Sequence, residues 1–191
     1  MVSLVKGQKI SLAKEAPTSK RFCVGLGWDV NKGLFGGGHD YDLDASAFVL
    51  RNGRLSGKND VIYYGNKGNS KSAVYHHGDN LTGAGDGDDE QITVALDKLD
   101  SDVDKVVFVV NIYQAKARKQ SFGKVKNAFI RLVDEDTNTE VLRYDLSKGG
   151  VGDVSALIFA ELYKKDGEWK FNAIGEGSKA NSIDELASNY R

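Results

Sequence analysis

The stretch that decides the fold is ALIFAELYKKDGEWKFNAI, residues 156–174. Two runs rich in Ala, Leu, Ile and Phe, residues 156–163 and 169–174, are separated by the five residues KKDGE. Asp166-Gly167 supplies the turn chemistry of a β-hairpin, because both residue types accept positive φ. We therefore expect two adjacent antiparallel strands here.

Seven further segments alternate apolar and polar residues or form short apolar blocks, which is typical of strands. They are residues 22–28, 41–50, 61–64, 91–96, 106–113, 128–133 and 141–146. Helix signals are limited to residues 114–120 and 182–190, where Ser182 and Glu185 have capping-box spacing. About nine strands and few helices predict an all-β fold, an antiparallel β-sandwich with a few short helices, as a single domain over residues 1–191.

Composition points to an ordinary globular chain. Its 191 residues are 40% hydrophobic and 28% charged, and 22 glycines against one proline favour tight turns. Cys23 is the only cysteine, so no intrachain disulfide forms. Residues 1–10 lack a long apolar stretch and no run approaches ~18 apolar residues, so we expect neither a secretory leader nor a membrane span, and a cytoplasmic location.

The net charge of −1 conceals an uneven distribution. Nine of the 27 acids lie in three segments, and the rest of the chain carries more basic than acidic residues. These acids are Asp29, Asp40, Asp42, Asp44, Asp79, Asp86, Asp88, Asp89 and Glu90. The sequence therefore predicts a local acidic site on a basic body.

The first acidic segment, DYDLDASAFVL, begins at Asp40. The two-residue period of a strand sends Asp40, Asp42 and Asp44 to one face. A solvated strand face would also show this spacing, so the segment alone leaves both interpretations open.

The second segment, GDNLTGAGDGDDE at residues 78–90, holds five carboxylates, one Asn, one Thr and four glycines without a basic residue. Carboxylates ~5 Å apart repel by about 3 kcal/mol per pair at an effective dielectric of ~20. A bound cation removes this repulsion. An acidic surface loop is the alternative.

Ca²⁺ is the cation that this donor set favours, because it accepts six to eight oxygen ligands in flexible geometry. Mg²⁺ demands a stricter octahedron, and Zn²⁺ normally recruits His or Cys. The number of acids favours two neighbouring Ca²⁺ ions with shared carboxylates. The loop is not an EF-hand, since Leu81, Gly83 and Ala84 occupy positions where that motif needs oxygen ligands or glycine.

Several motifs together resemble one family. GLGWD ends at Asp29, DLDAS begins at Asp42, and QSFG with AFIRLV follows the GDN…GDGDDE block; ELY and GEWKF extend the likeness. The chain resembles the TerD family from Val2 to about Gly177. The resemblance implies a Ca²⁺-binding β-sandwich of bacteria, associated with tellurite resistance and general stress, without enzymatic activity.

The family's acidic motifs fall on named positions of this chain, to which Asp29 and Asp40 add two further expected ligands. The expected metal ligands are Asp29, Asp40, Asp42, Asp44, Asp79, Asn80, Asp86, Asp88, Asp89 and Glu90. Two departures from the family pattern stand out. Residues 31–39 are unusually glycine-rich, and Ala84 replaces an acid found in some members.

Three other functions are open. His39, His76 and His77 lie beside the acids, so a metal-dependent hydrolase is the alternative, although no HExxH spacing is present. The same site could bind a sugar or lipid headgroup through Ca²⁺. A basic run around Phe122 could meet nucleic acid or an anionic membrane, but a solvated face explains it better.

The favoured interpretation is a non-catalytic protein in which Ca²⁺ orders acidic loops for a partner. We expect protein partners, including partners at the inner face of the membrane, and no nucleic acid. Cys23 lies in an apolar run, and we expect a buried, inert thiol.

Overall fold

The computed structural model describes residues 1–29, 41–69, 71–78, 87–146 and 152–191. Twelve strands are present in this part of the chain. They are β1 Val2–Leu4, β2 Lys9–Ser11, β3 Arg21–Gly27, β4 Leu43–Leu50, β5 Val61–Ile62, β6 Val74–His76, β7 Glu90–Ala95, β8 Lys105–Ile112, β9 Phe129–Asp134, β10 Thr139–Asp145, β11 Ala156–Lys165 and β12 Glu168–Ser178.

The helices are short. They are α1 Leu12–Glu15, α2 Ala115–Arg118, α3 Ile183–Ser188 and the 3₁₀ turns η1 Lys58–Asp60 and η2 Phe122–Lys124. The predicted all-β sandwich with few helices is confirmed. Among the described residues, no helix is long and apolar enough to cross a membrane.

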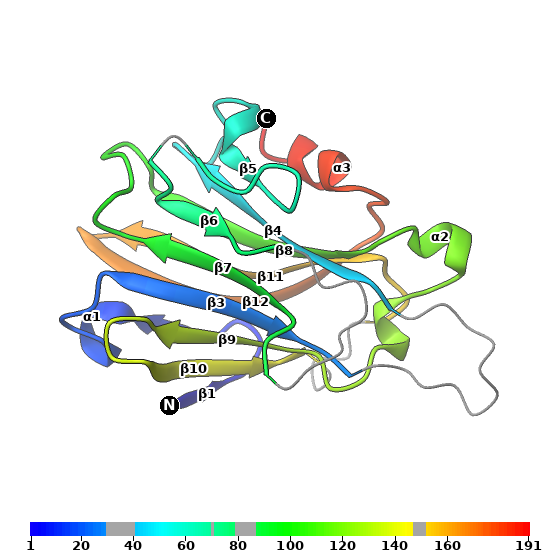
Figure 1. Ribbon diagram of the computed structural model, residues 1–191, viewed down its shortest axis with the longest axis horizontal. Helices are drawn as coiled ribbons and strands as arrows, with labels where there is room; N and C mark the ends of the chain where they lie inside the picture. Colours follow the sequence, from blue (N-terminus) through cyan, green and yellow to red (C-terminus); the bar gives the residue numbers. More distant parts are fainter. Residues whose placement is uncertain (30–40, 70, 79–86, 147–151) are drawn as a thin grey trace.

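The strands form two six-stranded sheets that face each other (Figure 1). The first sheet has the order β1-β10-β9-β3-β7-β6, and the second has the order β2-β12-β11-β8-β4-β5. Neighbours pair antiparallel as predicted, with one exception in the described sheets: β1 runs parallel to β10. The three-residue strands β1, β2 and β6 and helix α1 were not predicted, because so few residues carry no recognisable period.

The β11–β12 hairpin is confirmed. Lys165 pairs with Glu168, and the two residues between them, Asp166 and Gly167, have φ of 55° and 80°. Positive φ at both central positions defines a type I′ turn, whose twist matches that of the strands. The sequence signal and the geometry agree at this turn.

The main core lies between the sheets, and a second core lies outside the second sheet. Alternate residues of β4 explain both. Leu43, Ala45, Ala47 and Val49 face the main core, whereas Phe48 and Leu50 face the second core with Leu186 and Ala187 of α3. Every residue of β4 is therefore buried.

The second core depends on α3, which is capped as the sequence predicts. The Glu185 N–H donates to Ser182 Oγ at 3.2 Å. In a standard capping box the Glu185 carboxylate would accept from the Ser182 N–H. Here it accepts from the N–H of the preceding residue, Asn181, at 2.8 Å. An N-terminal cap of this kind satisfies amides that the first helical turn leaves unpaired.

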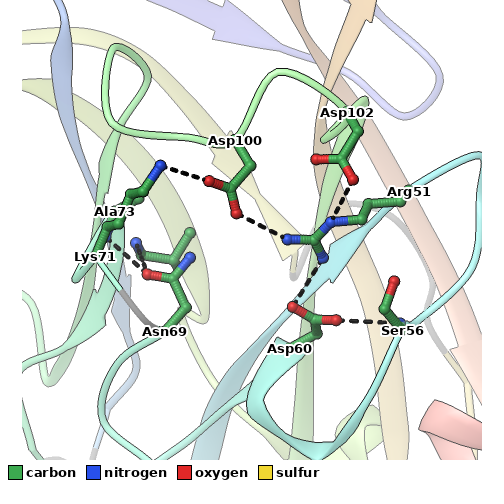
Figure 2. A network of polar contacts seen from close by, with 9 residues as sticks. Arg51, Ser56, Asp60, Asn69, Lys71, Ala73, Asp100 and Asp102 are labelled. Carbon is green, nitrogen blue, oxygen red and sulfur yellow. Dashed lines mark hydrogen bonds and ion pairs between the residues drawn. The ribbon is translucent and has the colours of Figure 1, made fainter.

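An ion-pair network ties three loops to the end of β4 (Figure 2). The Arg51 guanidinium contacts Asp60 at 2.9 Å, Asp100 at 3.1 Å and Asp102 at 3.0 Å. The second oxygen of Asp60 accepts from the Ser56 N–H, and Lys71 binds Asp100 at 2.7 Å. Sequence reasoning missed this network, because its acids lie in separate loops.

We predict that Arg51→Met destabilises the protein by roughly 1–3 kcal/mol, because it leaves the buried Asp60 carboxylate without its cation. Denaturant unfolding followed by circular dichroism measures the change. Asp102→Asn is the control: this side chain is 62% exposed, and its loss should change stability by less than about 0.5 kcal/mol. Equal losses in both variants would contradict a central role for Arg51.

Candidate functional site

The acidic motifs meet at one end of the sandwich. Asp29 follows β3, Asp42 precedes β4, and Glu90 begins β7, and these strand ends lie at the right-hand end of Figure 1. Within the first sheet, Leu26 of β3 pairs with Glu90 of β7. Four expected ligands, Asp40, Asp79, Asn80 and Asp86, and also His39, lie outside the described residues.

Trp28 links the three segments. Its backbone N–H donates to Asp89 Oδ2 at 2.9 Å, and its indole Nε1–H donates to the Tyr41 carbonyl at 3.1 Å. The Asp89 N–H in turn donates to the Leu26 carbonyl at 2.8 Å. The GLGWD and DLDAS motifs and the end of the acidic loop are therefore joined through one buried tryptophan.

Asp29 and Asp89 flank Trp28 and act on each other electrostatically. The pKa of Asp89 is raised, first by burial and then by the negative charges of Asp88 and Asp29, while the Trp28 N–H opposes the shift. Asp29 is exposed and accepts from the Asn127 side-chain amide at 2.5 Å. This end of the sandwich thus disfavours further negative charge.

Asp88 binds side chains of two neighbouring strands and thereby stabilises the fold. Its carboxylate binds Arg131 of β9 in a bidentate manner, at 2.7 and 3.1 Å, and accepts from the Gln91 amide at 3.2 Å. The side chain is only 1% exposed although it lies on the outer face of the first sheet. Its position explains Gly25, because a Cβ there would lie 2.2 Å from Asp88 Cγ.

Gly27, two residues after Gly25, also allows a neighbouring side chain to lie close to the β3 backbone. A Cβ at Gly27 would lie 2.5 Å from the Phe129 ring, and Arg143 stands over that ring at 3.5 Å from its centroid. The glycines of GLGWD therefore allow two side chains to lie flat against β3. Sequence reasoning missed Arg131, although isolated glycines in a strand indicate such close approach.

Glu90 points between the sheets and closes an open strand edge. β5 pairs with β4 at Ala47 and Phe48, so Ala45 lies beyond the end of β5. Glu90 Oε2 accepts from the Ala45 N–H at 2.5 Å, and His76 Nε2 lies 3.1 Å from the Ala45 carbonyl oxygen. Two side chains of the first sheet thus satisfy the backbone N–H and C=O of one residue of the second sheet.

The two described histidines, His76 and His77, form hydrogen bonds within the fold. His76 Nδ1 accepts from the Gly78 N–H at 3.1 Å, so Nε2 carries the proton that it donates to Ala45, and the side chain is fully buried. His77 Nε2 lies 2.8 Å from Thr93 Oγ1, and that hydroxyl donates to Glu135 at 2.7 Å. His76 Nε2 also lies 3.8 Å from Oε2 of Glu90, an acid that was predicted to bind metal.

Asp42 and Asp44 belong to the outer face of the second sheet. Asp44 Oδ2 accepts from Asn111 of β8 at 3.1 Å, and Asp42 Oδ2 lies 3.8 Å from the Arg118 guanidinium. Both carboxylates are buried. The predicted alternation within DLD is therefore correct, but Asp44 faces away from Glu90, which lies on the inner side.

The Cys23 thiol is buried, as predicted. Burial and, to a smaller extent, the charges of Asp88 and Glu135 raise its pKa to about 12, while the charge of Arg131 opposes the shift. The sulfur therefore stays protonated at neutral pH, and the thiolate that would be needed for nucleophilic chemistry is scarce.

The described acids do not form a complete metal site. Within the ranges that the structure describes, no three His, Cys, Asp or Glu side chains are grouped closely enough to hold a metal ion. Asp29, Asp42 and Asp89 lie nearest the ends of the loops and offer hard oxygen ligands of the kind that Ca²⁺ prefers. Asp88 and Glu90 are committed to Arg131 and to the Ala45 peptide.

These features define a class: two-sheet sandwiches whose acidic loop segments are anchored to the strands at one end. A family model, the TerD domain, matches residues 1–190. The chain belongs to the TerD family.

Named relatives and a solved structure agree. The chain is 52% identical over 177 residues to the tellurium resistance protein TerD of Serratia marcescens, covering 92% of this chain and 90% of the relative. It is 47% identical over 190 residues to general stress protein 16U of Bacillus subtilis, covering 99% and 96%. A crystal structure of a telluride resistance protein (TerD) homologue from Streptomyces coelicolor A3(2) superposes with a TM-score of 0.68 at 22% identity, covering 86% and 94%, and supports the fold.

We predict that Gly25→Ala destabilises the protein by about 1–3 kcal/mol, because the added methyl group would force Asp88 away from Arg131. Thermal unfolding measures the loss. Gly57→Ala is the matched control, since a Cβ at Gly57 meets no atom within 4 Å. A Gly25→Ala variant as stable as wild type would show that the Asp88–Arg131 pair does not fix the loop end.

Proposed function

We propose that this chain is a non-catalytic Ca²⁺-binding protein of the bacterial stress response, acting in the cytoplasm. The observation that carries the proposal is the crowding of Asp29 and Asp89 around Trp28, at the end where Asp42 also lies. The pKa of Asp89 is raised first by burial and then by the negative charges of Asp88 and Asp29. A divalent cation would relieve that repulsion.

The remaining ligands of the proposed site would come from the adjoining segments. Asp40 precedes Tyr41, Asp79 and Asn80 follow Gly78, and Asp86 precedes Gly87 in the sequence. With Asp29, Asp42 and Asp89 they supply only carboxylate and amide oxygens, as Ca²⁺ requires. We propose two ions, each with several of these ligands.

Because Arg131 and Ala45 hold the end of the acidic loop on the strands, the effect of Ca²⁺ binding would be confined to the acidic end of the sandwich. Arg131 holds Asp88, and the Ala45 peptide holds Glu90, so both ends of the Asp88–Glu90 segment are fixed to strands. Ca²⁺ would then order the acidic segments on an existing frame instead of folding the sandwich. In this arrangement, the ordered end would present a surface to a protein partner, including partners at the inner face of the membrane.

The names of the relatives support a role in stress. One relative is named for tellurium resistance and another for general stress. The proposal extends this role to the present chain.

Calorimetry and thermal unfolding with Ca²⁺ test the proposal. We expect heat of Ca²⁺ binding, and at 100 times Kd a gain of about 2.7 kcal/mol, which is roughly 5–10 °C in Tm for a chain of this size. Asp89→Asn keeps the acceptor for the Trp28 N–H but removes the charge. This variant should melt higher than wild type in chelator and gain less from Ca²⁺.

Asp97→Asn is the control, because Asp97 is exposed and follows β7 at the opposite end of that strand. It should bind Ca²⁺ as wild type does. The proposal fails if millimolar Ca²⁺ gives neither heat nor a rise in Tm. In pull-downs from stressed cells, a partner captured equally with Ca²⁺, with chelator and by Asp89→Asn would sink the proposed role of the ion.

A further inference from the structure

A cleft of ≈ 650 Å³ lies at the edge of the second sheet that β5 forms. One side of the cleft is the segment from the end of β4 to the turn after β5, and the other side is α3 with the residues after it. Figure 1 shows β5 and α3 next to each other at this edge. Pockets that hold small organic ligands measure roughly 300–1,000 Å³, so the cleft is large enough for one.

One wall of the cleft is apolar and continues the second core. Leu55, Val61 and Ile183 line the cleft, and the same three residues pack against the second core from its rim. Each of them is only partly buried. Because the removal of apolar surface from water is favourable, this wall suits the apolar body of a ligand.

The side of the cleft next to β5 is held in place by its own contacts. The Tyr63 ring lines the cleft and lies against Gly65, where a Cβ would be 2.6 Å from the ring. The Asn66 side-chain amide donates to the Val61 carbonyl at 2.8 Å. This side therefore has its shape before a ligand arrives.

The opposite side is tied to the same part of the chain by two hydrogen bonds. The Leu55 N–H donates to the Tyr190 carbonyl at 2.7 Å, and the Arg54 guanidinium donates to the Arg191 carbonyl at 3.2 Å. The two sides of the cleft are thus fixed relative to each other, although they are far apart in the sequence.

The charges around the cleft leave one ammonium group without a partner. In the 3₁₀ turn η1, the Asp60 carboxylate binds Arg51 at 2.9 Å, and on the other side Asp184 lies 3.5 Å from Arg191. Within the described ranges, by contrast, the Lys58 ammonium forms no ion pair and no hydrogen bond, although Lys58 lines the cleft. Both acids therefore have their own cation, and Lys58 is available to a ligand.

We propose that this cleft binds a small amphipathic carboxylate, a monoanion whose apolar body packs on the apolar wall. Its carboxylate pairs with the Lys58 ammonium and accepts from the Ser56 hydroxyl and the Asn59 amide, which also line the cleft. A phosphate monoester is a poorer match, because its charge of about −1.5 to −2 and its three acceptor oxygens are best met by arginine clusters. None of the described residues that line the cleft is an expected metal ligand.

Calorimetric titration of the full chain with 4-phenylbutyrate, in chelator and at low ionic strength, tests the proposal. We expect saturable binding. The alcohol 4-phenylbutanol has the same apolar body without the charge and should bind about three- to fivefold more weakly, as expected for the loss of one ion pair at a partly open site. The amine 4-phenylbutylamine should bind more weakly than the alcohol. An alcohol or amine that binds as tightly as the acid overturns the proposal.

Two variants separate the charge from the apolar wall. Lys58→Gln should bind the acid about three- to fivefold more weakly and the alcohol as wild type does. Ile183→Gln should weaken the binding of both compounds to a similar degree. Lys14→Gln and Val5→Gln are the matched controls, because both residues are exposed and lie outside the cleft. Wild-type affinity for the acid in Lys58→Gln, or an equal loss in Lys14→Gln, contradicts the proposal.

Amide shifts in NMR spectra locate the ligand even if Ile183→Gln does not fold. Titration of the wild-type protein with 4-phenylbutyrate should shift the amides of Leu55, Lys58 and Ile183 most. Larger shifts elsewhere, including the acidic end of the sandwich, overturn the proposal. Since chelator is present throughout, the result does not depend on whether the chain binds Ca²⁺.

Discussion

Ala45, through its backbone N–H and C=O, is the constraint on which the acidic end of this protein depends. It lies on a strand edge beyond the reach of β5, where a backbone N–H and C=O would otherwise be buried without partners. Glu90 and His76 satisfy both groups from the opposite sheet. A buried polar group without a partner costs about 1–3 kcal/mol, so these two contacts also help to hold the sheets together at this end.

The acids consequently divide into those that hold the loop end on the strands and those that we propose bind the cation. Asp88 and Glu90 are held by Arg131 and by Ala45, and they fix the end of the acidic loop on the outer and inner sides of one sheet. Asp29 and Asp89 meet around Trp28, where their charges repel. The structural pair therefore holds the repelling pair in place, as the proposed cation site requires.

Much of this architecture follows from local sequence rules. The Asp166-Gly167 turn and the cap at Ser182 depend on neighbouring residues alone, and both were predicted. The alternation of Asp42 and Asp44 was also predicted, because a period of two is a property of any strand.

The relation between segments was not predicted in the same detail. A period of two would place Asp88 and Glu90 on the same face. Asp88, however, precedes β7 and contacts Arg131 on the outer side of the sheet, whereas Glu90 points between the sheets. Arg131 and the Arg51 network were missed, because their partners lie 43 and up to 51 residues away. Gly25 and Gly27 were the one local signal of such a partner, because a glycine inside a strand indicates that another group approaches the backbone.

Amide hydrogen exchange followed by NMR, first in chelator and then in Ca²⁺, tests most directly whether structural acids hold a separate cation site. The Ala45 amide should exchange as slowly as the β4–β8 ladder in both conditions, because its partner is Glu90. The amides of Trp28 and Asp89 should gain protection when Ca²⁺ is added. Rapid exchange at Ala45 without Ca²⁺, or unchanged exchange at Trp28 and Asp89 with it, would contradict this division of the acids.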